Sequence, residues 1–480
     1  MEHFFDWFRR QPHLERPWLI LGKGPTFDLH ARFDLSAFHL LSLNHAVRER
    51  RVRVAHLIDL DVADACGEAL EHQAEYVVLP WYPHVRNAPG SRSLDQLVPG
   101  HALLRRLADQ SRLLWYDLST GPRRHGRGPV VQATYFSAEA AVSLLALAGA
   151  RQVRSLGVDG GASYSTDFDD LAQRTLLANG QQAFDLQFQG IARTIHATGV
   201  DFAPLDQPSP ILACVVGDGE SSLADRVLEF SLRKRASMTV RFQRIPTAGA
   251  VESAVESTVG IPGAPAAPAW RRALLFRPGT LVLNDIRKLW LRPGDGDRVE
   301  RPRRRGGEPA GPPAVLVASA AESSRLAELA EAGWDGPEAS ETLPASWGGG
   351  GALEGGDQSV VWFADPALQP WVSRAHPLAH LWVAELLDAV REQFIPLDVI
   401  QAESRQGRIR PSLLEQVVRG NAEPLLLPWT ARRLDASFIP PGTASPAARG
   451  APADPRDVLR AVARHVRRQA GAYRRARRGR

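Results

Sequence analysis

Residues 18–26 read WLILGKGPT, an apolar run that leads directly into a glycine-rich turn. It is the first of six such runs, which are WLILG (18–22), FHLLSLN (38–44), VAHLIDL (54–60), YVVLP (76–80), RLLWYDL (112–118) and VRSLGVD (153–159). Near-continuous apolar runs of this length are typical of parallel strands buried on both faces. Helical patterns lie between them at about 62–73, 94–109 and 137–149. The sequence therefore predicts an α/β fold with a Rossmann-like, doubly wound parallel sheet.

The alternation of strands and helices restarts after the segment DQPSP (206–210). Strands are expected at 211–217, 238–245, 273–283, 314–319 and 359–365, and helices at 221–235, 377–392, 397–405 and 411–419. Segments rich in Pro, Ala, Gly or Arg interrupt this half at 246–269, 291–313 and 345–356, where we expect loops. A chain of 480 residues is long enough for two domains. We place them at 1–205 and 211–430, followed by a Pro/Ala linker and a basic tail at 440–480.

Composition excludes several classes of protein. The two cysteines, Cys66 and Cys214, lie in apolar stretches, which excludes a disulfide framework and a zinc cluster. No apolar run reaches the roughly 18–20 residues of a membrane span, and the opening MEHFFDWFRR does not resemble a secretory signal. Arginines concentrate at 301–305 and after Arg456, but no nucleic-acid recognition motif accompanies them. We therefore expect a cytoplasmic protein that does not bind nucleic acid.

The glycine-rich turn is the first candidate binding element. Gly22 and Gly24 follow the first predicted parallel strand, where glycines let the backbone approach a phosphate and offer it N–H groups. A tight turn that merely needs glycine is an equally good explanation. The turn lacks the GK[ST] spacing of the Walker loop.

Polar residues stand at the ends of the other predicted strands. They are Asn44 and His45, Asp59 and Asp61, His84, and Asp159 followed by Tyr164. Because the carboxyl ends of strands in an open α/β sheet meet at the ligand crevice, we expect these side chains to line one site. Three have structural alternatives: Asp59 or Asp61 could cap the helix at 62–73, with Asp61 the one expected to do so, and His84 could be held in a turn. Asn44, at the end of an apolar strand, needs a hydrogen-bonding partner.

The strings LGKGPT, LN about twenty residues later and LGVDGGASY resemble the bacterial sialyltransferases that use a CMP-sugar without a metal ion. The resemblance covers about residues 17–170. Together with the strand ends it implies nucleotide-sugar contacts at Gly22, Gly24, Pro25, Thr26, Asn44, Asp59, Ser137 and Gly157. Ser137 is also expected as the N-cap of the helix at 137–149. The candidate catalytic residues are Asp159, His84 and Tyr164, with Asp159 or a histidine as the base and Tyr164 as a phosphate contact.

The catalytic-base histidine of that family has no convincing counterpart in this chain. His196 lies in the corresponding region, but within a helical pattern, and His84 and His45 are its rivals. Similar G-x-G-P loops and strand-end aspartates occur in archaeal-type 6-hydroxymethylpterin diphosphokinases. Diphosphotransfer to a pterin-like acceptor therefore stays open as an alternative.

The second half resembles bacterial relatives of the glycogenin-like, family-eight glycosyltransferases, which have the GT-A fold. The matching stretches are 215–235, 271–290, 363–373 and 409–414. Where the family carries its metal-binding D-x-D motif this chain has Arg277-Pro278-Gly279, and Trp362 replaces a metal-binding histidine. A divalent cation would need the missing carboxylates. We therefore expect a GT-A-like domain without a metal, either a pseudo-glycosyltransferase or one in which Arg277 binds a diphosphate directly.

The sequence also suggests roles for five other residues of this half. Asp285 is expected to be structural, capping the following helix or turn. Trp334, Trp347 and Trp371 could stack on sugars, whereas Trp382, within LAHLWVAELL, is expected in the core.

The tail at 455–478 is predicted to be a basic helix with Val458, Leu459, Val462 and Val466 on one side. An anionic membrane face, where lipid-linked acceptors lie, and a solvated arm are equally open interpretations. The sequence thus predicts a metal-independent glycosyltransferase, peripheral at the inner membrane face if the tail binds lipid. Its partners would be a nucleotide-sugar donor and a glycan or lipid-linked acceptor, with no further cofactor. A non-catalytic scaffold for surface-glycan assembly is the competing class.

Overall fold

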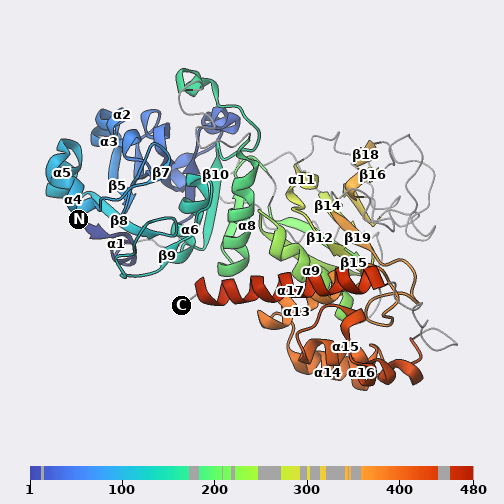
Figure 1. The fold of residues 1–480 in the computed structure, drawn as a ribbon. Coiled ribbons are helices and arrows are strands. Elements are labelled where there is room, and N and C mark those ends of the chain that lie inside the picture. The colour runs from blue at the N-terminus through green and yellow to red at the C-terminus, as the bar shows by residue number, and fades with distance from the viewer. Residues whose placement is uncertain are drawn as a thin grey trace.

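The computed structural model describes residues 1–11, 16–171, 183–207, 209–217, 222–246, 272–291, 300–302, 314–319, 341–343, 345–347, 358–441 and 455–478. Within these residues the chain forms two halves, each built on its own large sheet, with α8 (Gln187–Thr198) and α9 (Leu223–Arg235) packed against each other between them (Figure 1). The loops expected at 246–269, 291–313, 345–356 and 440–456 lie largely outside the described residues, as does Trp334.

The first sheet has nine strands and contains all six that the apolar runs predict. Its spatial order is β1 (Glu2–His3), β8 (Leu113–Leu118), β5 (Ala74–Pro80), β4 (Val52–His56), β3 (His39–Leu43), β2 (Trp18–Leu21), β10 (Gln152–Leu156) and β11 (Asp201–Pro204), with β9 (Val130–Val131) beside β8. Every pair in it is parallel. The predicted α/β fold with a parallel sheet is therefore confirmed for this half.

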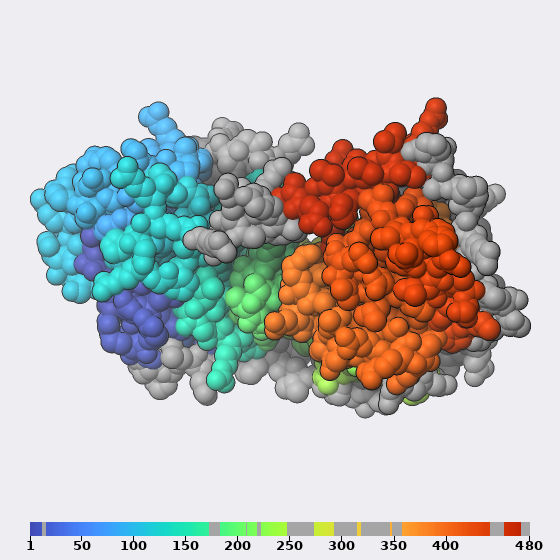
Figure 2. Space-filling model, turned by 60° about the horizontal axis from the view of Figure 1, so that its bottom comes forward, coloured from blue at the N-terminus to red at the C-terminus, as the bar shows by residue number. Residues whose placement is uncertain are grey.

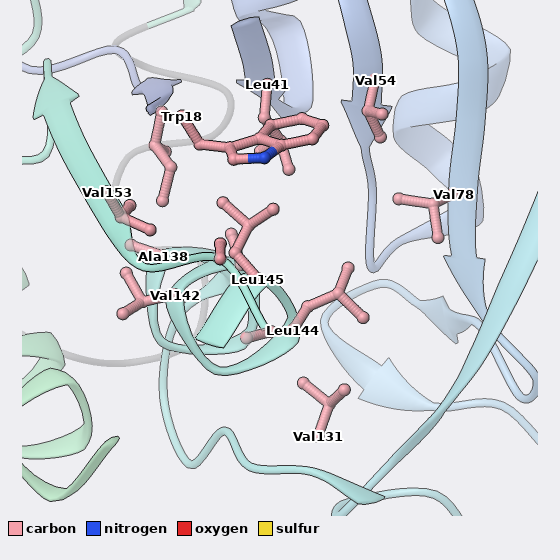
Figure 3. Close-up of a cluster of buried hydrophobic side chains, with 14 of the residues drawn as sticks. Trp18, Leu41, Val54, Val78, Val131, Ala138, Val142, Leu144, Leu145 and Val153 are labelled. Carbon is pink, nitrogen blue, oxygen red and sulfur yellow. The ribbon is translucent and has the colours of Figure 1, made fainter. Parts of the chain in front are cut away.

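Side chains that alternate across the strands give this sheet two apolar faces. On β2, Trp18 and Ile20 point to one face, and Leu19 and Leu21 point to the other. The first face is covered by α1 (Phe4–Arg9), α6 (Ser137–Ala148) and α8. The second is covered by η1 (Pro25–Arg32), η3 (Asn44–Arg48), α2 (Leu60–Ala65), α3 (Gly67–Gln73) and α5 (Ala102–Asp109). Figure 3 shows strand residues Trp18, Leu41, Val54 and Val78 on the same side as Ala138, Val142, Leu144 and Leu145 of α6.

Two of the predicted helices are interrupted. The segment 62–73 forms two helices, α2 and α3, which meet at Cys66. The segment 94–109 forms α4 (Leu94–Leu97), the 3-10 turn η4 (Val98–Gly100) and α5. Pro99 and Gly100 explain the second break, because both disfavour a continuous α-helix.

The third predicted helix, α6, ends where expected but begins differently. Gly149 caps its end with a φ of +100°. Phe136 is the N-cap residue, so the prediction that Ser137 caps this helix is wrong. The carboxylate of Glu139 accepts the backbone N–H groups of residues 134–136, each at 3.0 Å, and so ties the segment before the helix to its first turn. The side chain of Ser137 is left available for another contact.

The second sheet is mixed. Its order is β13 (Val240–Ile245), β12 (Ile211–Val216), β14 (Arg272–Phe276), β17 (Val315–Ser319), β16 (Glu300–Pro302) and β18 (Glu341–Leu343); β15 (Thr280–Val282) and β19 (Val360–Trp362) form a separate pair. The helices of this half are α9, α11 (Arg287–Trp290), α13 (Ala379–Arg391), α14 (Leu397–Arg405), α15 (Pro411–Val418), α16 (Trp429–Arg433) and α17 (Pro455–Arg478). β12 runs parallel to both its neighbours, whereas β17 is antiparallel to β14. No described helix, α17 included, is long and apolar enough to cross a membrane.

Several expectations for this half can be checked. The strand expected at 273–283 is two strands, because Arg277–Gly279 turns between β14 and β15. Asp285 is structural, as expected: its carboxylate accepts the backbone N–H groups of Ser237 (3.1 Å) and Arg287 (3.0 Å). Trp382 is fully buried.

The other described tryptophans of interest are also packed. Trp347 is 3% exposed, and the ring of Trp371 lies 5.1 Å from that of Trp382. Neither Trp347 nor Trp382 therefore presents an open face to a sugar.

Specific polar contacts hold the two halves together. The N–H of Thr239 donates to the carbonyl oxygen of Phe202 (2.9 Å), and the N–H of Phe202 donates to the Thr239 hydroxyl (2.8 Å). In α8, Nε2 of His196 is hydrogen-bonded to the carboxylate of Glu392. His196 is thus an interface residue within a helix, which removes it as a candidate base.

We predict that Gly157→Ala destabilises the protein more than Gly199→Ala. The two glycines share a left-handed backbone, with φ of +72° and +71°. A Cβ at position 157 would lie 2.4 Å from the carbonyl oxygen of Gly22, whereas a Cβ at position 199 would meet nothing within 4 Å. The control should therefore lose only the roughly 1–2 kcal/mol of the left-handed conformation. Urea denaturation measures both losses, and equal values would show that the loop at Gly157 moves aside without cost.

Candidate functional site

A cavity lies at the carboxyl edge of the first sheet. From β2 the chain adds β3, β4, β5 and β8 on one side, and then returns to add β10 on the other side. The reversal places the topological switch point, where ligands bind in open α/β sheets, between the ends of β2 and β10. The cavity there measures about 800 Å³, within the range of small-molecule sites.

Most of the sequence-predicted site residues line this one cavity. They are Gly22, Gly24, Asn44, Asp59, His84, Ser137, Gly157, Asp159 and Tyr164, together with the rivals His45 and Asp61. Pro25 and Thr26 do not line it. The chain turns into η1 at Pro25, which is exposed.

The two glycine loops bind each other. The N–H of Gly22 donates to the carbonyl oxygen of Leu156, and the N–H of Gly24 donates to that of Gly157, both at 2.8 Å. A Cβ on Gly22 would lie 2.2 Å from the carbonyl oxygen of Gly157. These N–H groups are therefore already engaged, so the expectation that Gly22 and Gly24 offer them to a phosphate is not supported. The glycines are needed here because two backbones touch.

Thr26 holds Asp159 in place. Its backbone N–H donates to Oδ2 of Asp159 (2.8 Å), and its hydroxyl lies 2.8 Å and 2.9 Å from the two carboxylate oxygens. The same hydroxyl oxygen accepts the N–H of Gly157 (2.8 Å). Burial raises the pKa of Asp159, and the hydrogen bonds from Thr26 oppose that rise. Thr26 is thus a residue that positions the carboxylate.

Asn44 is the clearest candidate for a ligand contact. It ends β3 in the left-handed conformation, with φ of +52°, which Asn tolerates better than most residues. Its amide nitrogen donates to the hydroxyl of Ser137 (3.2 Å). Its Oδ1 atom is buried and accepts no hydrogen bond from the described residues. A buried amide oxygen without a donor indicates a place where a ligand can supply one.

A small hairpin is formed by β6 (His84–Val85) and β7 (Ala88–Pro89). It contains His84 and is bound by Asp59 and Asp61. Asp59 accepts the N–H of Asn87 at 2.8 Å, and Asp61 accepts that of Arg86 at 2.5 Å. The expectation that Asp61 caps its helix is therefore wrong, because its carboxylate anchors the hairpin.

Nε2 of His84 lies 3.1 Å from the hydroxyl of Thr120. Burial lowers the pKa of His84 and raises the pKa of Asp59. His84 is therefore largely neutral at pH 7 and able to accept a proton.

One side of the cavity carries two basic residues that were not predicted from the sequence, beside the predicted His45. Lys23, His45 and Arg48 line it, and Nη1 of Arg48 donates to Oδ2 of Asp170 at 3.0 Å. Burial lowers the pKa of Lys23 to about 8, and burial together with the charges of Lys23 and Arg48 lowers the pKa of His45 to about 4. Lys23 was visible in the turn between the glycines, and its place there was the available signal.

An aromatic group was missed as well. Tyr164 stacks on Phe184, with ring centroids 5.9 Å apart. The centroid of the Phe136 ring lies 5.2 Å from that of Phe184. The ammonium of Lys23 lies 4.4 Å from the centre of the Tyr164 ring. Tyr135, 39% exposed, also lines the cavity. Rings at the wall of a site can stack on a base or a sugar.

The second half of the chain reaches the back of this site through Arg287. Its guanidinium lies 3.7 Å from the centre of the Phe188 ring at the start of α8. The preceding residue, Gln187, lines the cavity and donates to the backbone oxygen of Asp159 at 2.6 Å. Burial lowers the pKa of Arg287, and four aspartates oppose this: Asp285, Asp159, Asp185 and Asp206. The charge of Arg287 thus acts on Asp159 from the other half.

In the second half, Arg277 directly follows β14, and its guanidinium lies over the ring of Trp362 at 4.4 Å. The two residues that replace the expected metal-binding positions therefore contact each other.

Comparisons with protein-family models, with curated proteins and with solved structures found no match to this chain.

We predict that an anionic nucleotide such as CMP or UDP binds more weakly as the pH rises from 7 to 9. Lys23 loses its charge around its pKa of about 8, and a charge-assisted contact to phosphate is lost with it. Lys23→Met should lower the affinity at pH 7 by roughly tenfold and flatten the pH dependence. Calorimetric titration at several pH values measures both.

The matched control is Lys288→Met, at an exposed lysine outside the cavity. If the affinity of the Lys23→Met protein fell with pH as steeply as that of the unaltered chain, the pH dependence would belong to another group.

Proposed function

We propose that the N-terminal half is a glycosyltransferase that takes its sugar from a nucleotide-sugar without a metal ion. The observation that carries this proposal is the convergence of the predicted strand-end residues on one cavity of about 800 Å³ at the switch point. The volume suits a nucleotide-sugar, and the resemblance to the CMP-sugar-dependent sialyltransferases concerns the same segments. The acceptor would be a glycan or another cell-surface molecule.

The lining supplies a partner for each part of such a donor. Phe136, Tyr164 and Phe184 offer ring faces for the base or the sugar. Asn44, with its unpartnered Oδ1, offers an acceptor for an amino or hydroxyl group. Lys23 and Arg48 offer positive charge to the phosphate.

The transfer would proceed by attack of an acceptor hydroxyl on the anomeric carbon of the donor. A base takes the hydroxyl proton while the bond from the anomeric carbon to the phosphate oxygen breaks, and the nucleotide leaves with the electron pair. Lys23 and Arg48 would stabilise the charge that develops on the leaving phosphate. No residue in this scheme depends on a metal ion.

His84 is the better candidate for the base than Asp159. The lowered pKa of His84 keeps it neutral at pH 7 and ready to accept a proton. The carboxylate of Asp159 already accepts from both the N–H and the hydroxyl of Thr26, which favours a positioning role. Tyr164 remains the candidate contact to the phosphate, next to Lys23.

For the C-terminal half we propose a GT-A-like but non-catalytic domain. The supporting contact is that between Arg277 and Trp362, which puts a guanidinium and an indole where the resembling family binds its metal. A fixed positive charge disfavours a divalent cation at the same place. The half would then serve to bind the acceptor or to support the first half.

We predict that Asn44→Gly weakens nucleotide binding in the presence of EDTA. Glycine keeps the left-handed backbone that Asn44 adopts and removes only the amide, so the fold should be retained. Losing the amide contact should weaken a CMP- or UDP-linked ligand by roughly tenfold. The thermal shift caused by each ligand, with and without magnesium, measures this.

Gln393→Gly is the matched control, since Gln393 also has a positive φ, +61°, but lies in the second half. A shift only with ATP and magnesium would replace the proposal with a pterin-type diphosphokinase. No shift with any nucleotide would leave a binding scaffold.

We predict that His84→Gln lowers the rate of donor turnover by about 10²–10⁴-fold while donor affinity changes little. Because burial lowers the pKa of His84, protonation of this base should reduce the rate only at a more acidic pH than for an exposed histidine, whereas loss of the Lys23 charge should reduce the rate as the pH rises through about 8. Asp159→Asn should weaken both affinity and rate, as expected of a residue that orders the loop. Steady-state hydrolysis of the donor measures the effect of each variant and the pH dependence of the unaltered enzyme. If Asp159→Asn alone removed the rate, Asp159 would be the base.

A further inference from the structure

The C-terminal helix α17 is fixed to the second half by one of its faces. The guanidinium of Arg464 donates to both carboxylate oxygens of Glu423, each at 2.7 Å. Nη2 of Arg468 donates to the carbonyl oxygen of Ala384 (2.6 Å) and to Oδ1 of Asp388 (2.9 Å). Ala461, one turn before Arg464, is fully buried. These contacts determine which way the rest of the helix faces.

The opposite face of α17 is an apolar stripe exposed to solvent. Leu459, Val462 and Val466, at spacings of three and four residues, are 69%, 42% and 58% exposed. Nine residues at about 100° each place Arg468 about 180° from Leu459 around the helix. The ion pairs of Arg464 and Arg468 therefore hold the stripe outward. Figure 2 shows α17, in red, lying on the outside of the second half.

Positive charge accompanies the stripe. Arg456, Arg460 and Arg467 are exposed and lie at about 60–100° from Leu459 around the helix, beside the stripe. Residues 455–480 contain ten arginines and a single acidic residue, Asp457. A soluble surface gains nothing from three aliphatic side chains held out among arginines, so the arrangement needs a partner that is both anionic and apolar.

We propose that α17 is a membrane-surface anchor that lays the Leu459–Val466 stripe into the interface of an anionic bilayer. Lipid headgroups neutralise the arginines, and the acyl boundary receives the aliphatic side chains. A nucleic acid would match the charge, but phosphates and base edges offer little to a leucine and two valines. A second copy of the chain would bring arginines against arginines.

Such an anchor would hold the protein at the surface where lipid-linked molecules are found. It does not depend on the proposed sugar transfer, because it rests on α17 alone.

The test is co-sedimentation of the full chain with vesicles of phosphatidylcholine, alone or with about 30% phosphatidylglycerol. We expect binding only to the anionic vesicles, weaker at about 0.5 M salt than at about 0.1 M. The double variant Val462→Ser, Val466→Ser, which leaves the net charge unchanged, should lower the partition coefficient by at least tenfold. Val85→Ser, at an exposed valine in the first half, is the control and should bind as the unaltered chain does.

Both positions are exposed, so the double variant should retain its melting temperature, and a thermal scan checks this. Failure of the unaltered chain to bind anionic vesicles, or equal binding by the double variant, would overturn the proposal. So would tight binding of an RNA or DNA oligonucleotide that the double variant retains, because the helix would then act through charge alone. A concentration-dependent dimer that the double variant loses would assign the stripe to a second copy instead.

Discussion

The backbones of Gly22 and Gly157 touch, and the rest of the site depends on that contact. A side chain on either residue would collide with the carbonyl of the other. Because they touch, the loops after β2 and β10 run side by side at the switch point, and Thr26 of one loop reaches Asp159 of the other. The glycines thus act by letting two strand ends close on each other. The ligand-facing groups are the side chains that this closure leaves around the cavity, Asn44 and Lys23 among them.

Burial gives the cavity a common electrostatic character. Desolvation raises the pKa of Asp59 and Asp159 and lowers that of Lys23, His45 and His84, so each group is moved toward its neutral form. Such a cavity holds its charges at a cost in free energy, and a ligand of opposite charge relieves part of that cost. Charged groups in a partly dry site also interact more strongly with a ligand than they would in water. The cavity is therefore better prepared for a charged ligand than its modest number of ion pairs suggests.

The sequence alone predicted the first sheet well, because buried parallel strands carry a local signal in their apolar runs. It also predicted that polar strand ends such as Asn44 and Asp59 share one site, since the carboxyl ends of parallel strands must meet. It failed where the outcome depends on tertiary contacts. Ser137 lies inside the helix that it was expected to cap, and Asp61 accepts a hydrogen bond from a hairpin that is distant in sequence.

The aromatic side of the site could not be predicted from the sequence for a related reason. Phe136 and Phe184 are indistinguishable from core residues in sequence, and only the fold brings them to the cavity wall with Tyr164. Arg287 was less visible still, because it comes from the other half of the chain.

The position of Arg287 has a consequence for the ancestry of the protein. Its guanidinium packs on Phe188 of the first half, and its charge influences the ionisation of Asp159 there, so groups that act together are encoded in separate halves. Many two-domain proteins exchange partners by recombination, because their domains meet through interchangeable surfaces. Here an exchange of the second half would remove the cation that packs on Phe188 and acts on the charge of Asp159. The two halves are therefore expected to be inherited together, with Phe188 and Arg287 changing only in concert.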